Sequence, residues 1–294
     1  MPLTRHSRFI CCSAGWERGR TDWQFSQPAP AISGGTVFLS EIYISILGNR
    51  TFIKEKDIDL TCISESWERV DNPLSNVLDM EDYVVISNPH QRKTQGGRPA
   101  IVVNVKKFNV ENLTQTSITI PWGVEMIWII LSLKQSNNNS LIKKIVVGCI
   151  YSKPGSKKMT VLHDHIADVF HSLSAKYLDG LSWILCGDTN ELKLDPILHL
   201  SPKFRQCVDQ PTRYNPPAIL DPIITDLHTF YQTPVCEDPL QVDQDKVGSD
   251  SDHLMVTMTP LSTINNHVVT VKKRVEFRPL TDEGFKAMEI QLQI

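Results

Sequence analysis

Short runs of apolar, β-prone residues recur along most of this chain, and polar segments rich in Gly, Asn and Ser separate them. Runs of this length and composition predict buried strands. The strand-like segments are Thr36–Ile46, Leu60–Ser64, Tyr83–Ile86, Ala100–Val105, Glu125–Leu133, Ile142–Tyr151 and Trp183–Cys186.

The segments between these runs indicate how the strands connect. Gly96 and Gly97 lie in a polar loop that predicts a long hairpin, and the polar stretch 136–140 predicts another. Apolar residues at helical spacing predict one helix that crosses over between two strands. They are Leu162, Ile166, Val169, Phe170 and Leu173. Thr51–Lys56 and Asp195–Leu200 are expected to form short helices.

The ends of the chain differ from its middle. Residues 1–34 show no apolar periodicity and predict a poorly ordered segment, while 263–294 predict a linker with a short amphipathic helix. The whole chain has 41% apolar residues, and the stretch 35–262 is expected to form one large domain around its own core.

Polar motifs stand beside three of the apolar runs. Glu65 follows the run that ends at Ser64, Asp188 and Asn190 follow Trp183–Cys186, and Asp252-His253 precedes another short run. A lone Gly-Asp-x-Asn sequence is more often an ordinary turn. The three motifs together predict one divided metal site for phosphodiester hydrolysis.

The order of these motifs resembles the endonuclease/exonuclease/phosphatase superfamily over about 41–260. Within it, the chain is similar to the endonuclease domain of non-LTR retrotransposons. The superfamily resemblance rests on Glu65–Trp67, Ile150–Pro154, Gly187–Asn190, Pro211–Arg213, Leu220-Asp221 and Ser251–His253. The retrotransposon likeness rests on Asp59–Trp67, Gly96-Gly97 and Pro211–Arg213 before Leu220-Asp221. The resemblance implies an α/β (α+β) fold of the DNase I type, a four-layer sandwich of two mixed β-sheets flanked by helices.

The resemblance also implies metal and water-activating residues. Glu65 and Asp252 are expected to ligate Mg²⁺, with Mn²⁺ as an alternative, because hard carboxylate oxygens suit these ions. Asp188 is expected to accept the proton of the attacking water, and Asn190 to orient that water and donate to the phosphate.

Further contacts to the phosphate follow from the same resemblance. Asp221 is expected to orient His253, whose charged ring stabilises the transition state. Tyr151 is expected to hydrogen-bond the phosphate. Thr212 and Arg213 are candidates for backbone or substrate contact, and an ordinary solvated loop pair is nearly as good an interpretation.

One position departs from the family pattern. The first strand of the family carries an Asn that helps to position metal and phosphate, and Tyr43 occupies its place here. A neutral phenol is a poor ligand for a hard cation. The departure indicates either altered upstream sequence or an impaired site.

The composition indicates how the protein can contact DNA and in which kind of compartment it is expected. The 30 basic and 33 acidic residues give a net charge of -3, so any contact with DNA is expected to be local. Seven cysteines without a Cys-x-x-Cys pair favour a reducing compartment. The sequence shows no signal peptide or stretch long enough to span a membrane, and we expect an intracellular protein, nuclear or cytoplasmic.

Three functions remain open. The leading hypothesis is a Mg²⁺-dependent DNA endonuclease of retroelement type that nicks one strand, with a reverse transcriptase of the same element as a candidate partner. A non-catalytic remnant or nucleic-acid-binding module with the same fold is the second, and Tyr43 favours it. The third is a phosphomonoesterase of the same superfamily, for which the few lysines near Tyr151 supply little basic charge.

Overall fold

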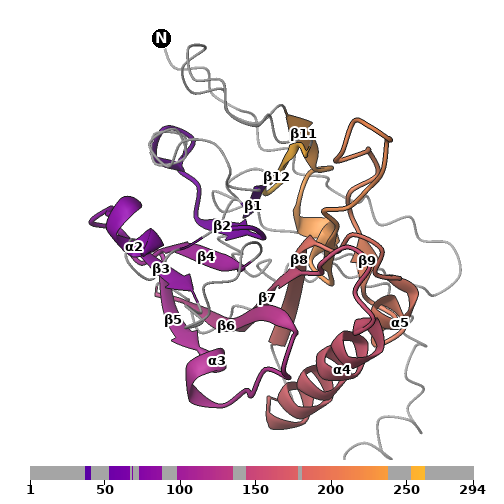
Figure 1. Ribbon diagram of the computed structural model, residues 1–294. Helices are drawn as coiled ribbons and strands as arrows, with labels where there is room; N and C mark the ends of the chain where they lie inside the picture. The colour runs from indigo at the N-terminus through magenta and orange to yellow at the C-terminus, as the bar shows by residue number, and fades with distance from the viewer. Residues whose placement is uncertain are drawn as a thin grey trace, which may run out of the picture. The chain divides into compact units, whose positions relative to one another are not determined.

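The computed structural model describes residues 53–66, 68, 73–87, 98–134, 144–177, 181–237 and 253–261, together with the backbone of 37–40 (Figure 1). All of them lie in one compact unit, Pro30–Asn265. Tyr43, Asp252 and both terminal segments lie outside the described residues. None of the helices within these ranges has the length and apolar character needed to traverse a bilayer.

One sheet contains six strands in the order β11-β12-β1-β2-β4-β3. β1 pairs in parallel with β2 and antiparallel with β12, so the sheet is mixed. The strands are β1 (Val37–Ser40), β2 (Leu60–Ile63), β3 (Tyr83–Ser87), β4 (Ala100–Asn104), β11 (Val235–Glu237) and β12 (Met255–Met258). The predicted hairpin is confirmed as the antiparallel pair of β3 and β4.

The other sheet has the order β5-β6-β7-β8-β10-β9. Its central strands β7 and β8 are parallel, and the predicted crossover helix, α4 (Met159–Lys176), connects them. The strands are β5 (Phe108–Asn112), β6 (Glu125–Leu133), β7 (Lys144–Tyr151), β8 (Leu181–Asp188), β9 (Arg205–Gln206) and β10 (Ile223–Thr225).

The alternation of side chains along the strands determines how the sheets pack. Because successive side chains point to opposite faces, Ile127 and Ile129 of β6 enter the core shared with Cys62 and Ile101 of the other sheet. Trp128, between them in sequence, packs on the opposite face. The two sheets therefore pack face to face.

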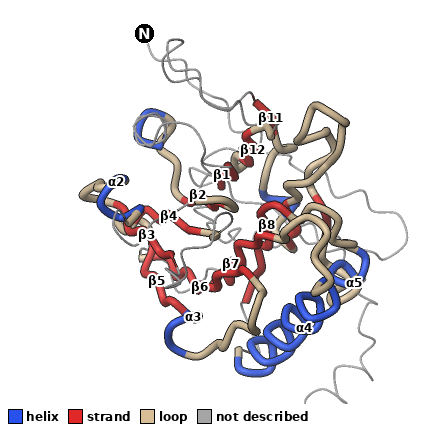
Figure 2. Tube along the Cα trace, in the orientation of Figure 1, coloured by secondary structure: helices blue, strands red, loops and turns tan. Residues whose placement is uncertain are grey.

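Helices cover the outer faces of this sandwich. α4 and α5 (Asp195–Leu198) pack through Ile166 and Ile197 against the outer face of the sheet that contains β7 and β8. A helical turn at 53–55 and α2 (Leu74–Val77) cover the outer face of the other sheet through Ile53 and Leu74. Figure 2 shows these helices on the two outer sides, with the strands between them. The architecture is the expected four-layer sandwich.

Two short helices complete the described elements. α3 (Leu113–Thr116) follows β5, and its Asn112 cap accepts a hydrogen bond from the Gln115 amide. A single 3₁₀ turn, η1 (His228–Phe230), follows β10. Neither carries a residue of the candidate site.

Candidate active site

Strand register places four polar residues in a row across one end of the second sheet. Glu125 of β6 is opposite Tyr151 of β7, which is opposite Asp188 of β8. Ile223 of β10 pairs with Cys186, so Asp221, two residues earlier, lies beside Asp188. Neighbouring strands lie about 4.8 Å apart, so these side chains form a continuous polar row.

The other sheet contributes residues to the same end of the sandwich. Glu65 lies two residues after β2, and His253 lies two residues before β12, which runs antiparallel to β1 beside β2. The phenol of Tyr151 hydrogen-bonds the carboxylate of Glu65 and so joins the two sheets. Burial and the negative charge of Glu65 raise the pKa of Tyr151, so the phenol stays protonated and donates to this carboxylate.

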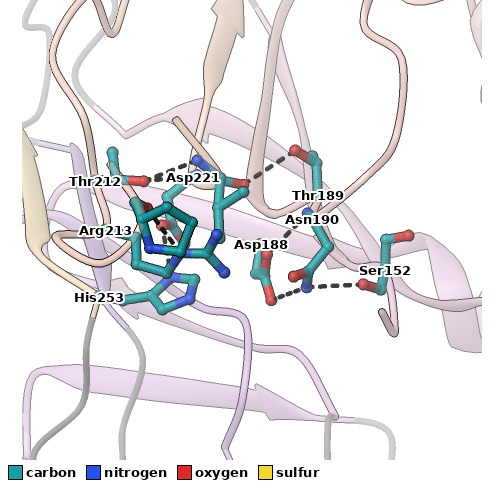
Figure 3. Close-up of polar contacts among 10 residues, drawn as sticks. Ser152, Asp188, Thr189, Asn190, Thr212, Arg213, Asp221 and His253 are labelled. Carbon is teal, nitrogen blue, oxygen red and sulfur yellow. Dashed lines mark hydrogen bonds and ion pairs between the residues drawn. The ribbon is translucent and has the colours of Figure 1, made fainter. Parts of the chain in front are cut away.

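Asn190 holds the carboxylate of Asp188 (Figure 3). The backbone amide of Asn190 donates to Asp188 Oδ1 at 2.9 Å, and its side-chain amide donates to Asp188 Oδ2 and to the Ser152 carbonyl, the latter at 2.9 Å. Asn190 adopts a φ of 44°, in the left-handed region that Asn tolerates better than most residues. The turn after β8 thus sets the orientation of the carboxylate.

The surroundings of Asp188 make it a stronger base than an ordinary carboxylate. Its pKa is raised to about 7, chiefly because the group is buried and also because Asp221 carries a like charge nearby. His253 and the Asn190 amide act in the opposite direction. A carboxylate with a pKa close to neutrality suits general base catalysis at physiological pH.

Asp221 and His253 form the expected carboxylate–imidazole pair. His253 Nδ1 lies 2.9 Å from Asp221 Oδ2, and both side chains are buried. With the carboxylate on Nδ1, that nitrogen carries a proton and Nε2 is directed elsewhere. The sequence-based expectation that these two residues meet is confirmed by this contact, while their catalytic role stays a prediction.

The loop before β10 holds this pair in place. The hydroxyl of Thr212 is fully buried and accepts the backbone amides of Leu220 and Asp221, at 2.9 and 3.1 Å. The amide of Leu254 donates to the Thr212 carbonyl. Thr212 therefore makes the backbone contact that was one of its two expected roles.

Arg213 lies next to the pair. Its backbone forms isolated antiparallel β-bridges with Ala218 and with His253. Its guanidinium donates to the Pro216 carbonyl at 3.3 Å. Figure 3 shows Arg213 and His253 together in the same part of the site. Its contact with a substrate stays a prediction.

Two places at this end of the sandwich offer ligand atoms to a divalent cation, a single carboxylate and a cluster of three residues. Glu65, the expected ligand, presents a half-buried carboxylate beside Tyr151, while its expected co-ligand Asp252 lies outside the described residues. Within the described ranges, ligand atoms of Asp188, Asp221 and His253 also lie within 4.8 Å of one another. Hard oxygen donors and accumulated negative charge fit Mg²⁺ or a similar ion.

The sequence did not predict the set of hydrogen bonds through which Arg98 holds the segment around Glu65. The Arg98 amide donates to Glu125 Oε2 at 2.7 Å, and the Arg98 guanidinium donates to the Glu68 carbonyl at 2.9 Å. The amide of Ser66 donates to the Arg98 carbonyl at 2.9 Å. A carboxylate as the first residue of a long apolar strand was the only signal for Glu125.

The sandwich of two mixed sheets with helices on both outer faces is a DNase I-like fold, the fold class of endonuclease/exonuclease/phosphatase proteins. No protein-family profile and no curated protein matches the sequence.

Solved structures with this fold are similar over most of the chain. The 3′ phosphatase NExo from Neisseria, solved with a product DNA hairpin, has a TM-score of 0.54 at 11% identity and covers 77% of this chain and 99% of its own. Truncated TDP2 from Caenorhabditis elegans has a TM-score of 0.55 at 12% identity, over 78% and 97%. An endonuclease/exonuclease/phosphatase family protein from Leptotrichia buccalis has a TM-score of 0.50 at 13% identity, over 77% and 99%. At these identities the likeness concerns the fold.

Proposed function

We propose that this chain hydrolyses phosphodiester bonds in DNA with the help of a divalent metal ion. The observation that carries the proposal is the meeting of two polar pairs at one end of the sandwich. The Asp188–Asn190 pair lies beside the Asp221–His253 pair, and Asp221 and His253 both change the pKa of Asp188. General acid–base chemistry needs such a combination of an oriented base and an oriented cationic donor.

The described residues divide the work of hydrolysis among them. Asp188, oriented by both amides of Asn190, takes a proton from the attacking water. His253, with Asp221 on Nδ1, presents Nε2–H to a phosphate oxygen and stabilises the charge that develops there. The phenol of Tyr151, which hydrogen-bonds Glu65 in this structure, is proposed to donate to a phosphate oxygen when DNA is bound.

Glu65 is the residue that we assign to the metal, and Asp252 is proposed as its partner. A Mg²⁺ or Mn²⁺ ion bound there supplies positive charge that polarises the phosphate and stabilises the leaving group. The assignment is supported by the hard carboxylate donor and by the like charges that gather around Asp188.

In its finer form, the proposal is an endonuclease of retroelement type that nicks one strand and works with a reverse transcriptase of the same element. The supporting observation is the sequence resemblance of Asp59–Trp67 and Pro211–Arg213 to that group. These segments carry Glu65 at the end of β2 and Thr212 in the loop that holds Asp221.

Removal of a terminal phosphate is the second candidate, because the same base and cationic donor also serve monoester hydrolysis. The similarity in fold to a Neisseria 3′ phosphatase supports including it. The two reactions differ in the bond that breaks and therefore in their products.

Labelled DNA duplexes separate these functions. One duplex is intact and the other ends in a 3′-phosphate, and each is incubated with the protein and Mg²⁺ while chain length and inorganic phosphate are measured. The proposal expects new internal strand ends from the intact duplex. Release of phosphate from the end without internal cleavage would favour the phosphatase. If neither product forms, both functions are contradicted.

A further inference from the structure

Two tight turns lie side by side next to the polar row of Glu125, Tyr151, Asp188 and Asp221. The turn before β6 is closed by the Val124 amide on the Pro121 carbonyl, and Gly123 adopts a φ of 80°. The turn after β7 is closed by the Ser156 amide on the Lys153 carbonyl, with Gly155 at a φ of 67°. Because these turns need glycine at their third position, both tips have a defined conformation.

Lys158 connects the two turns. Its ammonium donates to the Trp122 carbonyl at 2.7 Å and lies 3.6 Å from the centre of the Trp122 indole ring. Its backbone amide donates to the Ser156 hydroxyl at 3.2 Å. A Cβ atom at Gly123 would lie 2.3 Å from the ammonium, so glycine is also the residue that allows Lys158 to approach.

The connected turns present an aromatic ring among positive charges. Trp122 is 75% exposed, more than any other large apolar residue in the described ranges. Lys153 and Lys157 are exposed in the neighbouring turn, and Lys158 is half-buried against the indole. An indole exposed at the tip of a defined turn contributes little to the core and is placed where a flat ring can stack on it.

These turns adjoin the candidate active site directly. Trp122 precedes Glu125, which is opposite Tyr151 in the sheet. The second turn begins one residue after Ser152, whose carbonyl accepts the side-chain amide of Asn190. A DNA strand with a phosphate at Asp188 would therefore have its neighbouring nucleotides on the side of the sheet end from which these turns extend.

We propose that Trp122 and Lys158 form a binding site for an unpaired nucleotide of a DNA substrate, with the base on the exposed indole and a phosphate on the lysines. The inference rests on the proposed action on DNA and adds a preference for substrates with a single-stranded segment next to the reacting bond. Aromatic side chains accept any base by stacking, and cations beside them hold the backbone. Paired bases are already stacked in the duplex and do not offer their faces to the indole.

The test measures equilibrium binding of two fluorescently labelled duplexes, one blunt and one with a single-stranded overhang. Ca²⁺ replaces Mg²⁺ so that binding is measured without turnover. Trp122→Ala is expected to weaken binding of the overhang duplex about 10-fold, since stacking of a base on an aromatic ring has this order of effect. Binding of the blunt duplex is expected to be unchanged, and Trp122→Phe is expected to retain most of the affinity for the overhang.

A second cation–aromatic pair, distant from the two turns, provides the matched control. Lys144 lies 4.2 Å from the Tyr177 ring at the opposite end of β7. Lys158→Met is expected to weaken binding of the overhang, whereas Lys144→Met removes the same charge without this effect. Quenching of the parent's tryptophan fluorescence by single-stranded DNA, reduced in Trp122→Phe, gives a readout that does not depend on the alanine variant.

The inference is overturned if Trp122→Ala binds the overhang duplex as the parent does, or if it loses affinity for both duplexes equally. Hydrolysis in Mg²⁺ is measured in parallel on the same preparations. A parent that binds through Trp122 but does not hydrolyse DNA contradicts the proposed function and leaves the binding site standing.

Discussion

Asp188 is the residue on which the proposed chemistry depends most, because it is the buried base that two amide donors of Asn190 orient. Asp188→Asn preserves the size of the side chain but cannot accept the proton. We expect turnover to fall on the order of 10²-fold or more, the usual scale for lost acid–base catalysis. Single-turnover hydrolysis at saturating Mg²⁺ measures this, and an unchanged rate would remove Asp188 from the mechanism.

Thr212 is expected to act through Asp221 rather than on the substrate. Thr212→Val keeps the shape but leaves the amides of Leu220 and Asp221 without their acceptor. We expect the free energy of unfolding to fall by about 1–3 kcal/mol, the cost of buried unsatisfied donors. Urea unfolding measures the loss. Thr212→Ser restores the hydroxyl, so a serine variant as unstable as the valine variant would contradict this role.

Single residues of the site were predictable to different degrees. Glu65, Asp188 and His253 could be found because ionisable groups directly beside buried strands form a visible pattern. The contribution of Ser152 could not, because it uses a backbone carbonyl, and any residue type offers one. Glu125 was missed since its contact, the Arg98 amide, comes from the distant segment before β4.

Among the elements, the packing of α4 on β6 contains a titratable contact. His165 of α4 accepts the indole N–H of Trp128 on Nε2 at 3.0 Å, so this nitrogen is unprotonated. Burial lowers the pKa of His165, although Asp168 opposes the shift. Protonation would place two N–H groups against each other.

The sign of the resulting pH dependence follows from linkage. The unfolded chain takes up the proton of His165 near its ordinary pKa of about 6.5, before the folded chain does. The contribution of neutral His165 to the free energy of unfolding is therefore at its full value above that pH. It decreases as the pH falls below that value. Urea titrations across this range are expected to show a steeper loss for the parent than for His165→Gln. Parallel losses in the two proteins would exclude this contact as the cause.

The elements themselves were predictable where the pattern is long. β6, β7 and α4 extend over enough residues for their periodicity to be unambiguous. β9 and β11 contain two and three residues and carry too little pattern to be recognised. The pairing of β1 with β12 joins distant parts of the chain, so no local signal specifies its register.

At the scale of the whole molecule, the sandwich brings Glu65 from one sheet to Tyr151 of the other, and a bound cation is expected to strengthen this junction. A ligand that binds only the folded state raises stability, by about 2.7 kcal/mol at a concentration 100 times its Kd. We expect Mg²⁺ to raise the thermal unfolding midpoint of the parent and to raise that of Glu65→Gln less. An equal rise in both proteins would place the ion elsewhere.

The architecture as a whole was predictable because the order of the motifs resembles the endonuclease/exonuclease/phosphatase superfamily, and that resemblance implies a four-layer sandwich. The proposed DNA-binding surface was not, because Trp122 lies far along the chain from Lys153, Lys157 and Lys158, and those lysines alone supply little basic charge. Such a surface depends on turns that meet only in the folded chain, as those of Trp122 and Lys158 do.

Nicking of supercoiled plasmid DNA tests the central claim most directly. The parent, Asp188→Asn and Glu65→Gln are purified identically and incubated with plasmid in Mg²⁺ or in excess EDTA, and the loss of supercoiled DNA is followed over time. We predict open circles from the parent in Mg²⁺, none in EDTA, and strongly reduced rates for both variants. A parent that leaves the plasmid intact, or a rate that neither EDTA nor either substitution changes, would contradict a metal-dependent phosphodiesterase at this site.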